Sequence, residues 1–354
     1  MSPDPVPVLL AGDQLVRNHL LAADLEAVAG ADGSAAWTLR ELEFPWPDVP
    51  MGRVAEVEEA VGSEDEMIEA LAGVRVCLTQ LAPLTERVLD ACPDLQLFAV
   101  SRGGPVNANL EAATAHGVAV TFAPGRNATA TAEYAVGMML AALRGIAQGH
   151  RDVTDGRWKA DRFHFDRSGL ELDGTTVGLV GAGAIGGRVA RILLGFGARV
   201  QVHDPYAKPD ALPDGVTSVA LDELLASSRV VSLHARVTRE NRGMIGAAQL
   251  AAMPQGSVLV NCARGALLDH AALADALRGG HLLAAALDVF DVEPLPADHP
   301  LRDAPNVVLT PHLAGASQQV ARNASRMVAD EADRYRRGEP PRHCANPEVL
   351  EERR

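Results

Sequence analysis

Short apolar runs alternate with helical patterns along the first third of the chain. Runs rich in Val and Leu, of strand length and bounded by turn residues, predict strands over residues 5–12, 74–80, 95–104 and 117–125. Between them, SEDEMIEAL predicts a helix over 63–71 because acidic residues fill its first turn, and a second helix is expected at 85–91. Strands that alternate with helices indicate a parallel sheet covered by helices.

The alternation resumes after a long apolar helix predicted over residues 129–150. Further strands are expected at 229–235, 257–263, 283–290 and 306–312, with helices at 247–253 and 270–280. An amphipathic helix over 317–337 then leads to the tail CANPEVL, which we expect to return to the first part of the chain. Because 354 residues exceed a comfortable single core, we predict two α/β domains: 1–126 completed by 319–354, and 127–318.

The most specific pattern is TTVGLVGAGAIGGRVARILLGFGARVQVHDP, residues 175–205. It predicts a strand, a glycine turn, a helix and a second strand that ends at an acid. Gly181 permits the tight turn, Gly183 lets a pyrophosphate approach the backbone, and Gly186 lets the helix pack against the strand. Asp204 can accept both ribose hydroxyls of NAD and would repel the extra phosphate of NADP. The pattern predicts a Rossmann-type dinucleotide site, with a glycine-rich turn of another α/β protein as the alternative.

Composition and net charge limit the classes of molecule that the protein is expected to bind. A net charge of −14 argues against nucleic acid and against an anionic membrane surface. The four cysteines are scattered without paired spacing, so we expect no zinc site and no disulfide framework, and a reducing cytoplasm. No apolar run approaches the ~18 residues of a membrane span, and no signal peptide is expected.

Three polar residues follow predicted strands of the second domain, where ligands bind in open parallel sheets. Arg264 has a planar fork that can hold a carboxylate, and His312 is suited to exchange a proton near neutral pH. Glu293 can orient the imidazole and raise its pKa. Taken singly, they could be a surface ion pair, a turn residue and a loop histidine. Together with a nicotinamide, they favour hydride transfer between a 2-hydroxy acid and a 2-oxo acid.

The motifs LVGAGAIG, VLVNCARGALLD, AALDVFDVEPLP and NVVLTPHLAGAS resemble those of the D-isomer-specific 2-hydroxyacid dehydrogenases, which include D-3-phosphoglycerate, D-glycerate and D-lactate dehydrogenases. The resemblance implies a Rossmann-type doubly wound domain and a discontinuous flavodoxin-like substrate domain. It also implies that Arg264 binds the substrate, and that His312, paired with Glu293, exchanges the proton. The helix from about Thr131 is similar to the family's dimer arm, which implies a homodimer through the cofactor domains. The implied NAD contacts are Gly181, Gly183, Ala184, Ile185, Gly186, Asp204, His234, Ala235, Val237, Cys262, Ala263, Asp288 and Gly315.

The loop SRGGPVNAN departs from the family's G-x-G-x-D-N pattern. The backbone of Gly103 and Gly104 can still hold a carboxylate. Two interpretations of Arg102 are open. It binds a second anionic group of the substrate, such as a phosphate, or it is a structural residue at the rim of the substrate loop. Arg236 and Val237 also replace the usual Pro and Leu, which alters the shape of the nicotinamide-side loop.

The predicted substrate is therefore a small anionic acid, with a phosphorylated or sugar-derived acid such as 3-phosphoglycerate as one option. Two alternatives differ in class. A non-catalytic NAD-sensing protein, similar to the C-terminal-binding corepressors, would leave Arg264, Glu293 and His312 idle. A formate or phosphite dehydrogenase would keep the fold, but formate dehydrogenases of this superfamily carry Gln where this chain has Glu293.

Overall fold

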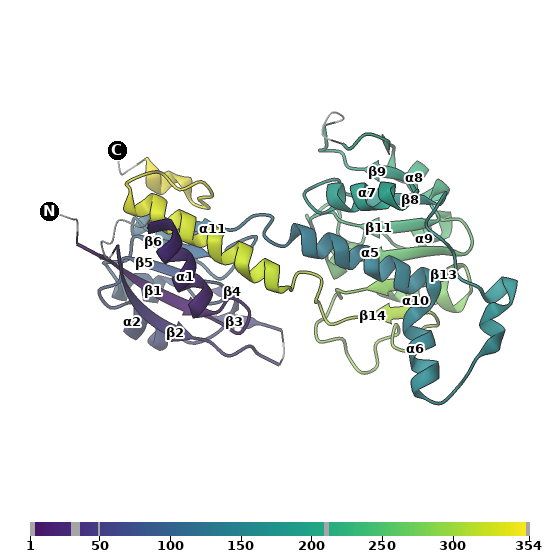
Figure 1. Cartoon of the computed structure of the whole chain (residues 1–354), viewed down its shortest axis with the longest axis horizontal. Coiled ribbons are helices and arrows are strands. Elements are labelled where there is room, and N and C mark those ends of the chain that lie inside the picture. The colour runs from purple at the N-terminus through teal and green to yellow at the C-terminus, as the bar shows by residue number, and fades with distance from the viewer. Residues whose placement is uncertain (1–3, 30–35, 49, 209–211, 352–354) are drawn as a thin grey trace. The chain divides into compact units, whose positions relative to one another are not determined.

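The computed structural model describes residues 4–29, 36–48, 50–208 and 212–351. The chain forms two compact units (Figure 1), of which unit 1 comprises residues 1–127 and 316–354 and unit 2 comprises residues 128–315. No helix in the described ranges is both long and apolar enough for a membrane span.

Unit 1 is built on a five-stranded parallel sheet with the order β2-β1-β5-β6-β7. This order is that of a flavodoxin-like doubly wound sheet, as predicted. A separate antiparallel pair, β3 and β4, precedes the third sheet strand. The strands are β1 (Val6–Gly12), β2 (Trp37–Glu43), β3 (Gly52–Val54), β4 (Val57–Ala60), β5 (Val76–Thr79), β6 (Leu97–Val100) and β7 (Ala119–Phe122).

Helices cover both faces of this sheet because successive strand residues point to opposite sides. Val8 and Leu10 pack under α1 and α11, whereas Leu9 and Ala11 lie in the core that α2, α3 and α4 cover. The predicted helix start at Ser63 forms a capping box with Glu66. The helices are α1 (Asn18–Ala29), α2 (Glu64–Leu71), α3 (Glu86–Ala91), α4 (Leu110–Ala115), α11 (Gln318–Arg336) and the 3₁₀ helix η5 (Pro347–Leu350).

The C-terminal segment returns to unit 1, so this unit is discontinuous. The helix α11 runs alongside α1 (Figure 1) and buries Ala324 and Val328 against the sheet core. The buried Asn346 accepts a hydrogen bond from Val120 N–H at 2.8 Å and donates one to the Val118 carbonyl at 2.9 Å. The tail is therefore held by the backbone of β7.

Unit 2 contains a seven-stranded parallel sheet with the order β10-β9-β8-β11-β12-β13-β14. The order reverses between β8 and β11, the topological switch point of a Rossmann sheet. The strands are β8 (Thr176–Val180), β9 (Arg199–His203), β10 (Val216–Ser218), β11 (Val230–Leu233), β12 (Ser257–Asn261), β13 (Leu282–Leu287) and β14 (Val307–Leu309).

Helices again cover both faces of this sheet. Met139 and Val189 pack on one face with Val177 and Leu179, and α8, α9 and α10 cover the other face. The helices are α5 (Ala128–Arg144), α6 (Ile146–Thr154), α7 (Gly186–Gly195), α8 (Leu221–Ser227), α9 (Ala247–Ala252) and α10 (His270–Arg278), with 3₁₀ helices η1 (Ala160–Phe163), η2 (Phe165–Arg167) and η4 (Gly265–Leu267).

One predicted element is wrong. The helix expected over 129–150 is two helices, α5 and α6, because Gly145 between them takes a left-handed backbone with φ +59°. Several elements had no prediction, among them α1, α4, α8 and the edge strand β2. The sequence WTLRELE of β2 lacks a buried apolar face, and most of its residues are exposed. Its hydrophobic pattern therefore gives little indication of a strand.

Candidate active site

The glycine turn after β8 has the geometry that its sequence predicts. Gly181 has φ +104°, a conformation that L side chains rarely adopt. A Cβ on Gly186 would lie 2.0 Å from the Gly181 carbonyl oxygen, so only glycine lets α7 begin here. Space around Gly183 is open, with no heavy atom within 4 Å of a Cβ built there. Among the described residues, the N–H groups of Ala184, Ile185 and Gly186 at the start of α7 have no backbone acceptor, and with the open space at Gly183 they fit a pyrophosphate.

Asp204 lies directly after β9 and connects to this turn. Its Oδ2 accepts the Ala182 N–H at 2.8 Å, and its Oδ1 accepts the Tyr206 N–H at 2.9 Å. Because each carboxylate oxygen can accept a second hydrogen bond, both remain available to ribose hydroxyls. The turn and its acid therefore fit NAD.

His234 supports the same turn from the end of β11. A Cβ on Gly181 would lie 2.8 Å from the Ala235 nitrogen, so the two backbones are in close contact. Burial lowers the pKa of His234 to about 4, and its Nε2 lies 3.0 Å from the Ser232 hydroxyl. This histidine is therefore neutral and suited to packing rather than to proton exchange.

His312 and Glu293 form the predicted pair, with His312 Nδ1 2.8 Å from Glu293 Oε2. The hydrogen bond to Glu293 raises the pKa of His312, and burial opposes it. Burial alone would raise the pKa of Glu293, but hydrogen bonds from His312 and from the Phe290 N–H at 2.9 Å lower it overall. Glu293 is therefore a carboxylate that stabilises the imidazolium form of His312.

Arg264 lies at the same edge of the sheet. Its positive charge adds to the lowering of the Glu293 pKa and opposes the raised pKa of His312, so the structure brings the three predicted residues together. The backbone after Arg264 approaches the segment after β13 closely at Gly265, because a Cβ there would lie 2.0 Å from the Phe290 backbone. The Arg264 side chain donates only to the neighbouring Ala263 carbonyl, at 2.7 Å, among the described residues. Its guanidinium fork is free to take an anion.

Two buried residues fix the loops of this site through hydrogen bonds, and the sequence analysis did not predict that role for either. Asp288, predicted as a cofactor contact, is fully buried; its Oδ1 accepts the Leu313 N–H and the Thr310 hydroxyl, and its Oδ2 accepts the Ala314 N–H. These bonds hold the loop in which His312 has φ +55°, a disfavoured backbone for a non-glycine residue. Asn261 likewise holds the Arg264 loop, donating to the Arg264 carbonyl at 2.9 Å. A buried polar residue at a strand end is the signal that could have found both.

The remaining predicted cofactor residues follow consecutive strands of one sheet. Ala235 and Val237 come after β11, Cys262 and Ala263 after β12, and Gly315 after β14, so all lie toward the carboxyl edge. Burial raises the pKa of the Cys262 thiol, so it stays protonated and is no nucleophile. Ala184 and Ile185 lie in the glycine turn itself.

The predicted substrate loop belongs to unit 1 and follows β6. Arg102 donates to the Glu59 carbonyl at 3.0 Å and forms an ion pair with the Glu59 carboxylate. In the part of the chain that the structure describes, no backbone carbonyl accepts the N–H of Gly103 or Gly104. The loop therefore offers two backbone donors, while the Arg102 charge is already paired.

Arg126, which the sequence analysis did not single out, lies beside Arg102. It donates to Gln80 Oε1 at 2.9 Å. Burial, with the nearby charge of Arg102, lowers the pKa of Arg126 to about 10. Burial also raises the pKa of Asp13, with Arg126 and Arg102 opposing it. Gln80 and Asp13 each follow a strand of the same sheet, and that position is the signal that could have pointed to them.

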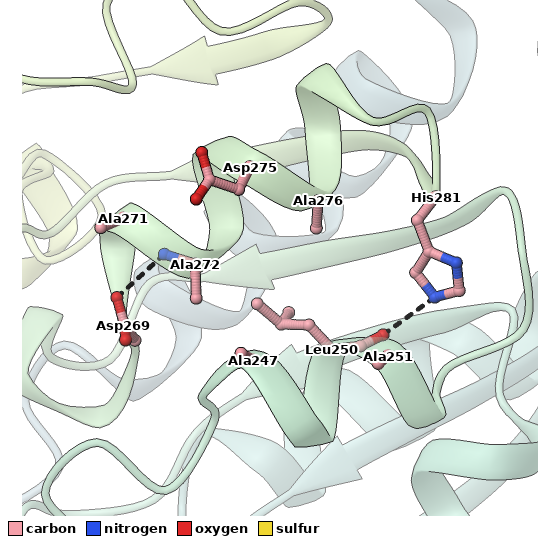
Figure 2. A pocket seen from close by; sticks show the side chains of 9 residues that line it. All are labelled: Ala247, Leu250, Ala251, Asp269, Ala271, Ala272, Asp275, Ala276 and His281. Atoms are coloured by element: carbon pink, nitrogen blue, oxygen red, sulfur yellow. Dashed lines mark hydrogen bonds between the residues drawn. The ribbon is translucent and has the colours of Figure 1, made fainter.

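Figure 2 shows a pocket between α9 and α10 in unit 2. Asp269 on its rim accepts the Ala272 N–H, and His281 contacts the Leu250 carbonyl at 3.1 Å. None of the predicted site residues lines it; most of its wall is alanine. It is a surface hollow apart from the chemistry described above.

The doubly wound sheet, the glycine turn with Asp204 and the acid–base pair define a class: an NAD-dependent oxidoreductase. Residues 136–314 match the family model described as D-isomer specific 2-hydroxyacid dehydrogenase, NAD binding domain. The chain belongs to the D-isomer specific 2-hydroxyacid dehydrogenase family.

Relatives bear this out over most of the chain. A glyoxylate reductase of Korarchaeum cryptofilum is 37% identical over 298 residues, which are 84% of this chain and 90% of the relative. A D-3-phosphoglycerate dehydrogenase of Archaeoglobus fulgidus is 36% identical over 83% of this chain, but the chain spans only 55% of its length. The crystal structure of the TT0316 protein of Thermus thermophilus is 32% identical, with a TM-score of 0.78 over 96% of this chain and 100% of that one.

Proposed function

We propose that the protein exchanges a hydride between a D-2-hydroxy acid and its 2-oxo acid, with unit 2 (predicted as 127–318) as the NAD domain and unit 1 (1–126 with 319–354) as the substrate domain. The observation that carries the proposal is the 2.8 Å His312–Glu293 pair coupled to Arg264 at the carboxyl edge of the sheet. Bound NAD supplies or accepts the hydride.

The residues of this chain do the rest. Arg264 binds the substrate carboxylate through its fork. In the oxidation direction neutral His312 removes the hydroxyl proton, and in reduction protonated His312 returns it. Glu293 holds the ring in orientation and stabilises its charged form. Asp288 and Asn261 fix the two loops on which these side chains stand.

The test is loss of NADH absorbance with a panel of pyruvate, glyoxylate, hydroxypyruvate and 3-phosphohydroxypyruvate. We expect turnover with at least one 2-oxo acid. NADH binding without turnover of any would favour the NAD-sensing alternative instead. The reverse assay with formate, phosphite and NAD is expected to show no reaction.

We propose further that the substrate carries a second anionic group, as 3-phosphoglycerate does. The proposal is supported by Arg126, which has a polar partner but no ion-pair partner among the described residues. Because Glu59 already pairs with Arg102, Arg126 is the stronger candidate of the two to take an anionic group in unit 1. A kcat/KM for 3-phosphohydroxypyruvate above those for pyruvate and glyoxylate would support this; the reverse order would contradict it and point to a glyoxylate-type substrate.

Replacing Glu293 by Gln is expected to shift the pH dependence of both directions to lower pH. Glu293 raises the pKa of His312, so its removal lets His312 lose its proton at lower pH. Reduction, which needs the protonated ring, then fades at lower pH than in the wild type, and oxidation begins at lower pH. Profiles of kcat/KM against pH in both directions measure this; profiles that superimpose on the wild type would contradict the coupling.

Replacing Asp204 by Ala is expected to lower the preference for NAD over NADP by about 10- to 100-fold in kcat/KM, since a hydrogen bond to a charged group is worth about 1.5–3 kcal/mol. The variant also loses the bond to Ala182 N–H. Asp204→Asn is the matched control because it keeps an oxygen for that bond but removes the charge. An unchanged ratio in both variants would show that another residue selects the cofactor.

We propose that two copies associate through the segment after α5. Its side chains Trp158 (83% exposed), Phe163 (83%) and Phe165 (93%) are bare apolar surface, typical of an interface. The segment is ordered by Asp152, whose carboxylate binds Arg157, Lys159 and Arg162 and has a pKa of about 2, mainly through Arg162.

The triple change of Trp158, Phe163 and Phe165 to Ser is expected to convert a dimer into a monomer. Light scattering after size-exclusion chromatography measures the mass. Trp46→Ser, which changes a 42% exposed tryptophan in unit 1, is the control. A dimer that survives the triple change would place the interface elsewhere.

We also propose that the protein is located in the cytoplasm. The free thiols of Cys77, Cys92 and Cys262 fit a reducing compartment.

A further inference from the structure

His270, Asp291 and His299 converge in unit 2, outside the acid–base pair. His270 begins α10, and the other two lie in the segment between β13 and β14 that also carries Glu293. His270 Nδ1 lies 3.2 Å from Asp291 Oδ1, and His299 Nε2 lies 3.5 Å from the same oxygen. One ligand atom from each residue lies within 4.8 Å of the others.

These atoms are close without forming well-aligned hydrogen bonds to one another. His270 is only 4% exposed, and the Val289 backbone and Asp291 Oδ1 lie near its ring, but neither ring nitrogen has a hydrogen bond of good geometry among the described residues. A buried polar atom left unpaired is costly, so the arrangement calls for a further group. Three possible ligand atoms within 4.8 Å of one another are close enough to share one metal ion.

The exposure of the three side chains suits the same role. The His270 side chain is only 3% exposed. The His299 side chain is also mostly buried, at 9% exposed, while that of Asp291 is 51% exposed. Solvent can therefore reach the site from the aspartate side.

We propose that His270, Asp291 and His299 bind a divalent transition-metal ion, with zinc preferred. In tetrahedral zinc sites the N and O ligands lie about 2.0–2.2 Å from the metal, which places them roughly 3.4 Å apart. The distances of 3.2 and 3.5 Å fit this requirement. Water takes the fourth position on the exposed side. The site departs from the expectation of no metal, because its histidines are far apart in sequence and show no paired spacing.

The ion links the start of α10 to the segment that holds Glu293. It closes a loop within unit 2, so binding stabilises the fold and the position of Glu293. The ion takes no part in the proposed hydride transfer. The proposal of a metal site therefore does not depend on that function.

The experiment uses the untagged full chain after treatment with a chelator. Titration with ZnCl₂ is followed by calorimetry, and titration with CoCl₂ by the visible ligand-field absorption of the bound ion. We expect one equivalent of each metal to bind and the thermal midpoint to rise with zinc. His270→Gln, Asp291→Asn and His299→Gln should each weaken zinc by at least about 10-fold, the loss typical of even outer-shell changes.

Matched variants separate this site from others. His116→Gln removes a different histidine–aspartate pair, with His116 Nε2 2.9 Å from Asp90, and should bind zinc as the wild type does. Asp291→Asn changes an exposed side chain, so it tests the site even where a change at buried His270 prevents folding. The proposal is overturned by the absence of stoichiometric binding, or by binding that survives in the three variants. Zinc lost only in His312→Gln would also overturn it, because the ion would then lie on the Glu293 pair.

Discussion

Replacing His312 by Gln lowers kcat by about 10²–10⁴-fold in both directions, the range expected for the loss of general acid–base assistance. The substituted amide can donate a hydrogen bond, but it cannot take up and return a proton. Because proton exchange occurs in the reaction and not in binding, KM should change much less than kcat. Steady-state rates with NADH and the best 2-oxo acid, and with NAD and the matching hydroxy acid, measure the effect.

The backbone at this position calls for a second variant. His312 has φ +55°, and Asn tolerates this left-handed region better than most residues. Equal losses in His312→Asn and His312→Gln, with unchanged thermal midpoints, would assign the effect to chemistry rather than to folding. His19→Gln, an exposed histidine on α1, is the control. Near wild-type kcat in both variants would contradict the role of His312.

Replacing Arg264 by Lys is expected to reduce kcat/KM by about 10- to 100-fold, since a hydrogen bond to a charged group is worth about 1.5–3 kcal/mol. Lysine keeps the charge but lacks the planar fork that holds a carboxylate in two parallel bonds. The loss should fall mainly on the KM for the oxo acid, with a smaller effect on NADH binding.

The comparison of Arg264→Lys with Arg264→Met separates geometry from charge. The methionine variant should be weaker still, and His312 should then titrate at higher pH, because the Arg264 charge lowers its pKa. Arg326→Lys, a 66% exposed arginine on α11, is the control. An unchanged KM for the oxo acid in both variants would exclude Arg264 as the carboxylate site.

The sequence alone was most informative where a short local pattern reflects a local physical constraint. The glycine turn is an example, because the spacing of Gly181 and Gly186 reflects a backbone conformation that few other residues allow. Arg264, Glu293 and His312 were found because each follows an apolar strand. The break at Gly145 was missed, because a glycine within an apolar helical pattern is often tolerated. Edge strand β2 was missed because its residues are mostly exposed.

Some features depend on contacts between distant residues. The Arg102–Glu59 ion pair, the burial of Arg126 against Gln80 and the triple acceptor role of Asp288 join positions that lie far apart along the chain. The His270–Asp291–His299 cluster is of the same kind. No periodicity records such contacts, since they arise when strands and loops are brought to one edge.

The sequence by itself determined the parallel α/β architecture, the dinucleotide turn, the position of Asp204 and the three residues at the strand ends, because each follows from local backbone chemistry or strand order. Only the tertiary structure decided how those residues are held. It placed Gly265 against the Phe290 backbone so that Arg264 lies near the pair, and it fixed His312 in a left-handed backbone through Asp288. The physical reason is that pKa values and side-chain direction depend on burial and neighbours, which packing sets across long separations in the chain.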